Sequence, residues 1–158
     1  MSLRIRQAES ADAAVVVEFN CLLAEETEGK TLNRAEIEPG VAAVLADPVK
    51  GLYFLAEDQG RIVGQIGLTY EFSDWRNGWF WWIQSVYVRP AARRRGVFRA
   101  LYGHLEEMAR RDSSVAGLRL YVDKSNRPAQ ETYLNLGMTP TEYFILEKYP
   151  LSNPSGAE

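Results

Sequence analysis

The sequence predicts one α/β (α+β) domain built around a mixed sheet, with the element order β-α-α-β-β-β-α-β-α-β. Three observations predict it. The 158 residues are about one domain's length, and the 46% hydrophobic and 25% charged composition is that of an ordinary globular chain. The spacing of apolar residues also switches between helix and strand periods along the chain. We expect the domain to span residues 1–150 and residues 151–158 to form a frayed tail.

The N-terminal third of the chain predicts a short strand and two helices. Residues 3–7 alternate between polar and apolar side chains, as a strand does. Ser10 can cap a helix that runs to about Glu28, because apolar residues recur on one face of that segment. Asn33 begins a capping-box spacing for a second helix, which the Pro39-Gly40 pair interrupts or shifts.

Three strands follow in the middle of the chain, separated by turn signals. The last of them is apolar on both faces, so we place it in the interior of the sheet. Asn77-Gly78 is a hairpin-turn signal, so this strand is expected to pair antiparallel with the strand before it. The three strands are expected over residues 51–57, 61–72 and 79–88.

The remaining elements alternate between helix and strand. Apolar residues recur every three or four positions over residues 96–111, which predicts a helix. A strand is expected over residues 117–122. Asn126 can cap a short helix that Gly137 ends, and residues 141–149 are expected to close the fold as a last strand.

Charge and cysteine content exclude several function classes. The net charge of −3 makes a general affinity for nucleic acid unexpected. Cys21 and His104 are the chain's single cysteine and single histidine, so we expect neither an internal disulfide nor a metal site. No apolar run approaches the ~18 residues that span a bilayer, and residues 1–10 lack the apolar core of a signal peptide. We therefore expect a cytoplasmic protein without a membrane partner.

The most informative stretch is the arginine turn, RPAARRRGVFR at residues 89–99. It holds five arginines and no acid, so the rest of the chain carries −8. It also joins an interior strand to a helix through Gly96. Backbone N–H groups at a helix start are unsatisfied and electropositive, so such a turn can seat a compact anion such as a pyrophosphate. A solvated basic turn is the alternative, and neither the P-loop nor the Rossmann glycine pattern is present.

Two motifs stand in order on the expected elements. IQSVYVRPAARRRGVFRALY at residues 83–102 is similar to the cofactor motif [QR]-x-x-G-x-[GA], and residues 126–138 are similar to the segment N-x-x-A-x-x-x-Y-x-x-x-G-[FM]. Both motifs are those of the GNAT superfamily of acyl-CoA-dependent N-acyltransferases, which the chain resembles over about residues 3–149. The resemblance implies a GNAT-type fold, with a central mixed, mostly antiparallel sheet and helices on both faces.

The resemblance also implies acetyl-CoA as cosubstrate and assigns roles along the two motifs. The backbone amides of the arginine turn would hold the CoA pyrophosphate. The N–H of Val86 would polarise the acyl carbonyl, and Tyr133 would protonate the leaving thiolate. The implied catalytic residues are Tyr133 and Val86, and the implied cofactor-binding residues are Val86, Val88, Arg93, Arg94, Arg95, Gly96, Val97, Phe98, Arg99, Asn126 and Tyr133.

Two residues depart from the family pattern. Phe98 stands where the motif has Gly or Ala, so its ring must point away from the phosphates or the turn is locally altered. Gln84 stands where many relatives carry Glu or His, and an amide cannot accept a proton. A side-chain general base is therefore in doubt. Direct attack by an already neutral amine, or proton relay through water, is favoured instead.

The acceptor site is indicated less sharply than the cofactor site. The first helix ends in Glu25 and Glu26, which could form one wall of a site for a cationic amine or simply a solvated helix end. Asp74 and Trp75 could form another wall or a plain hairpin turn. Together with Gln84 on the strand before the arginine turn, these are the expected substrate-binding residues.

The expected function is an N-acetyltransferase that moves an acetyl group from acetyl-CoA to a primary amine by direct attack in a ternary complex. The acceptor would be a small molecule or a peptide amine, and the acidic helix end favours a small cationic amine. A homodimer is compatible with this fold. One alternative is a catalytically silent acyl-CoA sensor of the same fold. The other is a nucleic-acid binder that uses the arginine turn, for which interleaved aromatic platforms are missing.

Overall fold

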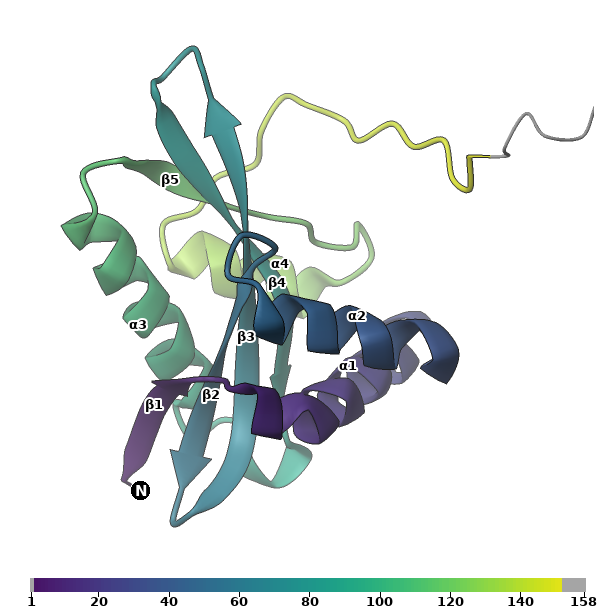
Figure 1. Cartoon of the computed structure of the whole chain (residues 1–158). Coiled ribbons are helices and arrows are strands. Elements are labelled where there is room, and N and C mark those ends of the chain that lie inside the picture. Colours follow the sequence, from purple (N-terminus) through teal and green to yellow (C-terminus); the bar gives the residue numbers. More distant parts are fainter. Residues whose placement is uncertain (1, 152–158) are drawn as a thin grey trace, which may run out of the picture. The chain divides into compact units, whose positions relative to one another are not determined.

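The computed structural model describes residues 2–151, and backbone contacts divide the chain into two units, residues 1–121 and 122–158. A single domain over residues 1–150 stays a prediction. No helix among the described residues is long and apolar enough to cross a membrane. The elements in Figure 1 are β1 (Leu3–Gln7), η1 (Ser10–Asp12), α1 (Ala13–Glu28), α2 (Arg34–Ala46), β2 (Leu52–Asp58), β3 (Arg61–Ser73), β4 (Gly78–Val88), η2 (Pro90–Ala92), α3 (Val97–Arg111), β5 (Val115–Leu120) and α4 (Arg127–Asn135).

The strands of the first unit form one five-stranded sheet in the order β1-β2-β3-β4-β5. Strands β1 to β4 pair antiparallel with their neighbours, whereas β5 runs parallel to β4. The predicted mixed, mostly antiparallel sheet is therefore confirmed. Strand β4 lies between β3 and β5, as its two apolar faces predict.

Helices cover both faces of this sheet. Gly64 and Gln65 are adjacent on β3, so they point to opposite faces. The side chain of Gln65 bonds to Asn20 on α1, whereas a Cβ at Gly64 would meet Val97 and Leu101 of α3. Figure 1 shows α2 beside α1, on the opposite side of the sheet from α3.

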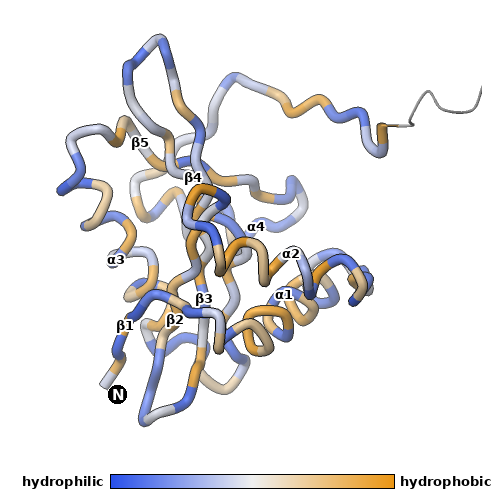
Figure 2. Tube along the Cα trace, in the orientation of Figure 1, coloured by the Kyte–Doolittle hydropathy of each residue, from blue (hydrophilic) through white to orange (hydrophobic). Residues whose placement is uncertain are grey.

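The core follows from this layering. Figure 2 shows hydrophobic residues along α1 and the central strands, and hydrophilic residues at the β2–β3 and β3–β4 turns. The amphipathic pattern of α3 turns its apolar residues to the sheet, as the sequence predicts. The large side chains with less than 2% exposure are Phe19, Leu55, Ile66, Leu68, Leu101, Leu105, Gln65, Val16 and Val97.

The first helix begins differently from the prediction, whereas the second begins at the predicted cap, Asn33, and is not interrupted at Pro39-Gly40. A capping box between Glu9 and Asp12 starts the 3-10 turn η1, so Ser10 is not the cap. Helix α2 begins after Asn33, whose side chain accepts a hydrogen bond from the N–H of Ala35 at 3.0 Å, and continues through Pro39. The φ angle that proline imposes is close to the helical value, so the helix can continue through Pro39. It does so without the backbone hydrogen bond that the missing N–H would donate.

The predicted last strand over residues 141–149 is wrong, because this segment forms no strand in the structure. Its apolar side chains are exposed instead: Phe144 is 82% and Leu146 94% exposed. A strand needs a neighbour to take up its backbone hydrogen bonds, and no described strand pairs with this segment. The tail predicted for residues 151–158 lies, from residue 152 on, outside the described residues.

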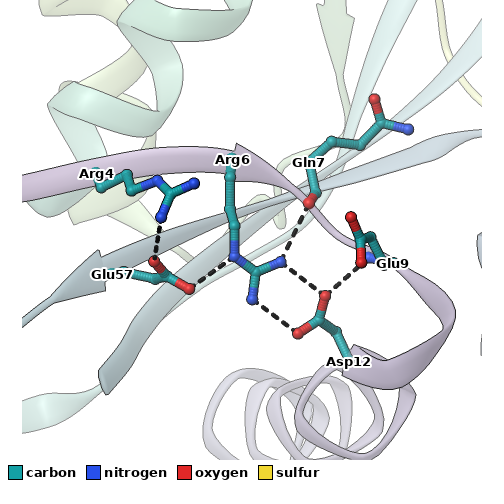
Figure 3. A network of polar contacts seen from close by, with 6 residues as sticks. All are labelled: Arg4, Arg6, Gln7, Glu9, Asp12 and Glu57. Carbon is teal, nitrogen blue, oxygen red and sulfur yellow. Dashed lines mark hydrogen bonds and ion pairs between the residues drawn. The ribbon is translucent and has the colours of Figure 1, made fainter. Parts of the chain in front are cut away.

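A cluster of charged side chains ties β1 to β2 and to the start of α1 (Figure 3). The Nε of Arg6 donates to Glu57 at 2.6 Å, and its two terminal nitrogens donate to Asp12 at 2.8 and 2.9 Å. The side chains of Arg6 and Asp12 are only 26% and 12% exposed, so the pair is largely shielded from water. These hydrogen bonds hold the pKa of Asp12 below its ordinary value of 3.8.

Replacing Arg6 by Met should lower the free energy of unfolding by about 1–2 kcal/mol, because two half-buried carboxylates lose their cation. A carboxyl whose folded pKa is depressed adds stability above its unfolded pKa and loses it as the pH falls through the folded pKa. The difference in the free energy of unfolding between wild type and Arg6→Met, measured by urea unfolding, should therefore be largest at about pH 7. It should shrink below about pH 4. Arg4→Met is the control, since Arg4 is 76% exposed and 3.9 Å from Glu57. A difference that stays constant with pH would contradict this role.

Candidate active site

A β-bulge interrupts the pairing of β3 with β4. Gln65 faces Tyr87 and Gly67 faces Gln84, so one residue of β3 is opposite both Ser85 and Val86. Ser85 has φ +49°, in the left-handed region that non-glycine residues seldom adopt. A bulge of this kind bends its strand and redirects the groups beside it.

The same stretch of β4 lacks a second neighbouring strand. β5 pairs with β4 only from Trp79 to Ile83, so beyond Ile83 the described strands leave β4 bonded to β3 alone. The N–H of Arg89 donates to Val63 on the β3 side at 2.9 Å. Because N–H groups alternate along a strand, those of Val88 and Val86 are directed to the opposite, open edge. An extended ligand could bond to this edge as another strand would.

The arginine turn lies just after this open edge and leads into α3. Arg94 and Gly96 both have positive φ, +60° and +84°, and Gly96 is the residue that precedes the helix. Glycine brings no capping side chain, and the first turn of α3 holds no acidic residue. A Cβ at Gly96 would meet nothing within 4 Å, so the amides at the start of α3 can be approached closely. This end of the helix is electropositive and suited to an anion.

The arginines of the turn are not equivalent. Arg89 donates to both carboxylate oxygens of Glu18 on α1, at 3.0 and 3.2 Å, and stacks over the ring of Phe19, so it holds α1 against the end of β4. Arg93 folds back to Val88 O at 2.9 Å and bonds to Glu26. The other three arginines, Arg94, Arg95 and Arg99, are exposed around the start of α3.

Arg95 and Phe98 of the turn each contact a residue outside it. Arg95 is 3.8 Å from Asp58 at the end of β2. The ring of Phe98 lies 6.0 Å from that of Tyr102, one helical turn further along α3. Phe98, which stands where the motif has Gly or Ala, is thus accommodated by packing along its own helix.

The structure brings Glu26 into the same cluster as the arginine turn. Its carboxylate accepts from the Tyr87 hydroxyl at 3.1 Å and from Arg93. Burial raises the pKa of Tyr87, and the bond to Glu26 raises it further. The ring of Tyr87 packs on that of Phe19, and nothing in the sequence pairs its hydroxyl with Glu26.

The other acceptor candidates have hydrogen-bond partners outside this cluster. Gln84 donates to the Thr69 hydroxyl at 3.3 Å, across the β3–β4 pair. Asp74 accepts from the N–H of Trp75 at 3.0 Å in the β3–β4 turn, which is at the other end of β4 from Arg93. The structure therefore does not bring Asp74 and Trp75 to the acidic end of α1, where Glu25 is exposed.

The second unit contains the later motif on α4. Asn126 caps this helix through a 3.2 Å hydrogen bond from the N–H of Ala129, and Gly137 follows it with φ +89°. The predicted cap and terminator are therefore confirmed. Tyr133 is half-buried on the helix, and its role in proton transfer stays a prediction.

The resemblance implies that the CoA pyrophosphate lies at the amides of α3, so Gly96→Ala should weaken acetyl-CoA binding about tenfold, because the new methyl group would stand between the phosphate oxygens and these amides. Gly29→Ala is the matched control. Gly29 also has positive φ, +61°, and also has open space around its missing Cβ, so both substitutions strain the backbone alike. Thermal unfolding should shift similarly in the two variants, while calorimetry should find acetyl-CoA binding weakened only in the first. Equal affinities would contradict an anion seat at Gly96.

The chain is similar to known acetyltransferases. The model of the acetyltransferase (GNAT) family matches residues 19–138. A protein from Clostridium difficile 630, described as a possible acetyltransferase, is 41% identical with a TM-score of 0.90, over 96% of this chain and 100% of that one.

Two more distant structures share the fold. A predicted acetyltransferase with acetyl-CoA from Clostridium acetobutylicum is 19% identical with a TM-score of 0.74, over 93% of this chain and 96% of that one. An aminoglycoside acetyltransferase from an uncultured soil metagenomic sample is 21% identical with a TM-score of 0.70, over 96% and 100%. A comparison with curated proteins found no match.

Proposed function

This chain belongs to the GNAT family of acetyltransferases and depends on acetyl-CoA, and from that premise we propose that it acetylates a primary amine by direct attack in a ternary complex. Acetyl-CoA would supply an activated thioester. The observation that carries the proposal is the open edge of β4 beside the bulge, which leads directly into the electropositive start of α3. A strand-like pantetheine arm and a pyrophosphate need these two features in this order.

The residues of the chain then have defined tasks. The amides that follow Gly96 bind the pyrophosphate, with Arg93, Arg94, Arg95 and Arg99 around them. The Val88 N–H bonds the pantetheine arm, and the Val86 N–H donates to the acyl carbonyl, where negative charge develops during transfer. Tyr133 donates a proton to the departing thiolate.

No proton acceptor is assigned at Gln84. Its amide cannot take a proton from the attacking amine and is already bonded to Thr69. The amine must therefore arrive neutral or lose its proton through water. Gln84 is proposed to orient the acceptor instead.

The acceptor is proposed to be a small-molecule or peptide amine, and a small cationic amine is favoured because it would bind beside the acidic end of α1. Glu25 and Glu26 supply the negative charge there. A homodimer and the absence of a nucleic-acid partner stay predictions.

A panel of amines tests the function. The panel should include amino acids, polyamines, aminoglycosides, peptide N-termini and protein lysines, with acetyl-CoA and a thiol-release assay. Turnover with at least one amine is expected. Tight acetyl-CoA binding without turnover on any of them would favour the acyl-CoA sensor, and steeply salt-dependent duplex binding without CoA affinity would favour the nucleic-acid binder.

Glu26→Gln should raise acetyl-CoA affinity by about two- to fivefold, because it removes the carboxylate that competes for Arg93. This contact is between side chains that are 43% and 39% exposed, and such exposed pairs contribute about 0.2–1 kcal/mol. The same change should raise the acceptor KM. Glu25→Gln is the control with the same charge change on the neighbouring residue, and it should raise only the acceptor KM. Calorimetry and steady-state kinetics measure both effects. Unchanged CoA affinity in Glu26→Gln would remove Arg93 from the phosphate site.

A further inference from the structure

A chain of buried side-chain hydrogen bonds runs from α1 and β2 to the bulge in β4. Gln65 on β3 is completely buried, and its Nε2 donates to Asn20 Oδ1 at 2.8 Å and to the backbone carbonyl of Ser85 at 3.1 Å. Asn20 in turn donates to the Tyr53 hydroxyl at 3.1 Å. We propose that Gln65 is a positioning residue, which holds the bulge so that the Val86 N–H is aimed at the acyl carbonyl. The inference rests on the proposed function.

The direction of these bonds follows from one fixed group. The carbonyl of Ser85 can only accept, so Gln65 must present its NH₂ group to it. That NH₂ group also faces Asn20, which must therefore present its oxygen to Gln65 and its own NH₂ group to Tyr53. The Ser85 carbonyl in the bulge thus sets the hydrogen-bond orientation of Gln65, Asn20 and Tyr53, which lie on three other elements. These side chains in turn hold the bulge in place.

The bulge is a conformation that needs support. Ser85 adopts φ +49° without being glycine, and backbone strain of this kind persists only where the surroundings over-determine it. Relaxation to a regular ladder would shift β4 by one residue and turn the Val86 N–H away from the open edge. The bond from Gln65 to the Ser85 carbonyl opposes this shift directly.

The chemistry of Gln65 argues against a purely structural role. Its Oε1 is buried and accepts no hydrogen bond from any residue that the structure describes. A buried amide with an unsatisfied oxygen is less favourable than an apolar side chain of the same size. Methionine or leucine would stabilise this part of the core better than glutamine does. The amide of Gln65 is therefore explained by the Ser85 carbonyl that it holds.

Gln65→Met tests this, because it keeps the length of the side chain and removes the donor. We expect acetyl-CoA affinity within about threefold of wild type and kcat lowered about ten- to hundredfold on an amine from the panel. The infrared carbonyl band of ¹³C-labelled acetyl-CoA bound to the variant should move back towards its position in free acetyl-CoA, since the thioester is no longer polarised. The band needs no acceptor, so it is readable before the amine is known.

Tyr53→Phe is the matched control. It breaks a hydrogen bond at the far end of the same chain and leaves the bond from Gln65 to Ser85 in place. It should lower the melting temperature while kcat and the carbonyl band stay within about twofold of wild type. Parallel losses of stability and kcat in both variants would assign the whole chain to folding and overturn the proposal.

Ser85→Gly supplies a rescue, because glycine adopts positive φ without strain. Added to Gln65→Met, it should return kcat to within about fivefold of wild type, and it keeps the test available if Gln65→Met alone does not fold. A folded double variant without recovery, or a Gln65→Met protein with wild-type kcat and carbonyl band, would overturn the inference. A wild-type protein that binds no acetyl-CoA or acetylates no amine would instead overturn the proposed function.

Discussion

Reversing the charge of both Arg94 and Arg95 to glutamate should weaken acetyl-CoA binding at least about tenfold. Both guanidinium groups are exposed beside the start of α3, whose first turn holds no acidic residue. Each charge-assisted hydrogen bond to an anion contributes about 1.5–3 kcal/mol, and the new carboxylates would also repel the pyrophosphate. Calorimetric titration with acetyl-CoA measures the loss.

The matched control reverses Arg110 and Arg111 at the other end of the same helix. These two arginines pair with Glu106 and Glu107, so the net charge of the protein changes equally while the start of α3 stays intact. Acetyl-CoA affinity in the control should change less than about twofold. If both double variants bind acetyl-CoA alike, the arginine turn is a solvated loop and the phosphate site lies elsewhere.

Tyr133→Phe should lower kcat about 10- to 100-fold and leave acetyl-CoA affinity nearly unchanged. The hydroxyl group of a tyrosine carries a proton that it can donate to the departing thiolate. General acid catalysis contributes about 10²–10⁴-fold, and a thiolate is a fair leaving group unaided, so the low end is expected. Steady-state and single-turnover kinetics on an amine from the panel measure the effect.

Tyr143→Phe controls for the loss of a hydroxyl group in the same unit. Tyr143 is 76% exposed, so its variant should keep full activity. The alternative for Tyr133 is that it only packs α4, in which case phenylalanine would be neutral in both rate and stability. Full kcat in Tyr133→Phe, measured where chemistry limits the rate, would remove Tyr133 from the mechanism.

Features that depend on neighbouring residues were predictable from the sequence. Asn126 was predicted to cap a helix, and its side chain accepts the capping hydrogen bond. Gly137 was predicted to end that helix, and it has the positive φ that favours glycine. Caps and turns of this kind involve residues three or four positions apart, so the local sequence specifies them.

The strand predicted over residues 141–149 shows where local pattern fails. Tyr143, Phe144, Ile145 and Leu146 have strong strand propensity, yet the segment forms no ladder and its apolar side chains are exposed. Strand propensity describes a fit to a half-buried pleated surface, and it cannot supply the partner that makes a strand. Local pattern also failed at α2, where the Pro39-Gly40 pair was expected to interrupt or shift the helix and the helix passes through it.

The sequence by itself determined the fold class, the family and the arginine turn that leads into α3 through Gly96, because these depend on composition and on the spacing of residues that are near one another in the chain. Only the tertiary structure decided that Ser85 sits in a bulge, since the bulge exists only in the register of β4 against β3. It also decided that Glu26 pairs with Arg93, 67 residues away, and so links the acidic end of α1 to the arginine turn. The physical reason is the same in both cases: a register or an ion pair depends on groups that only the folded chain brings within bonding distance.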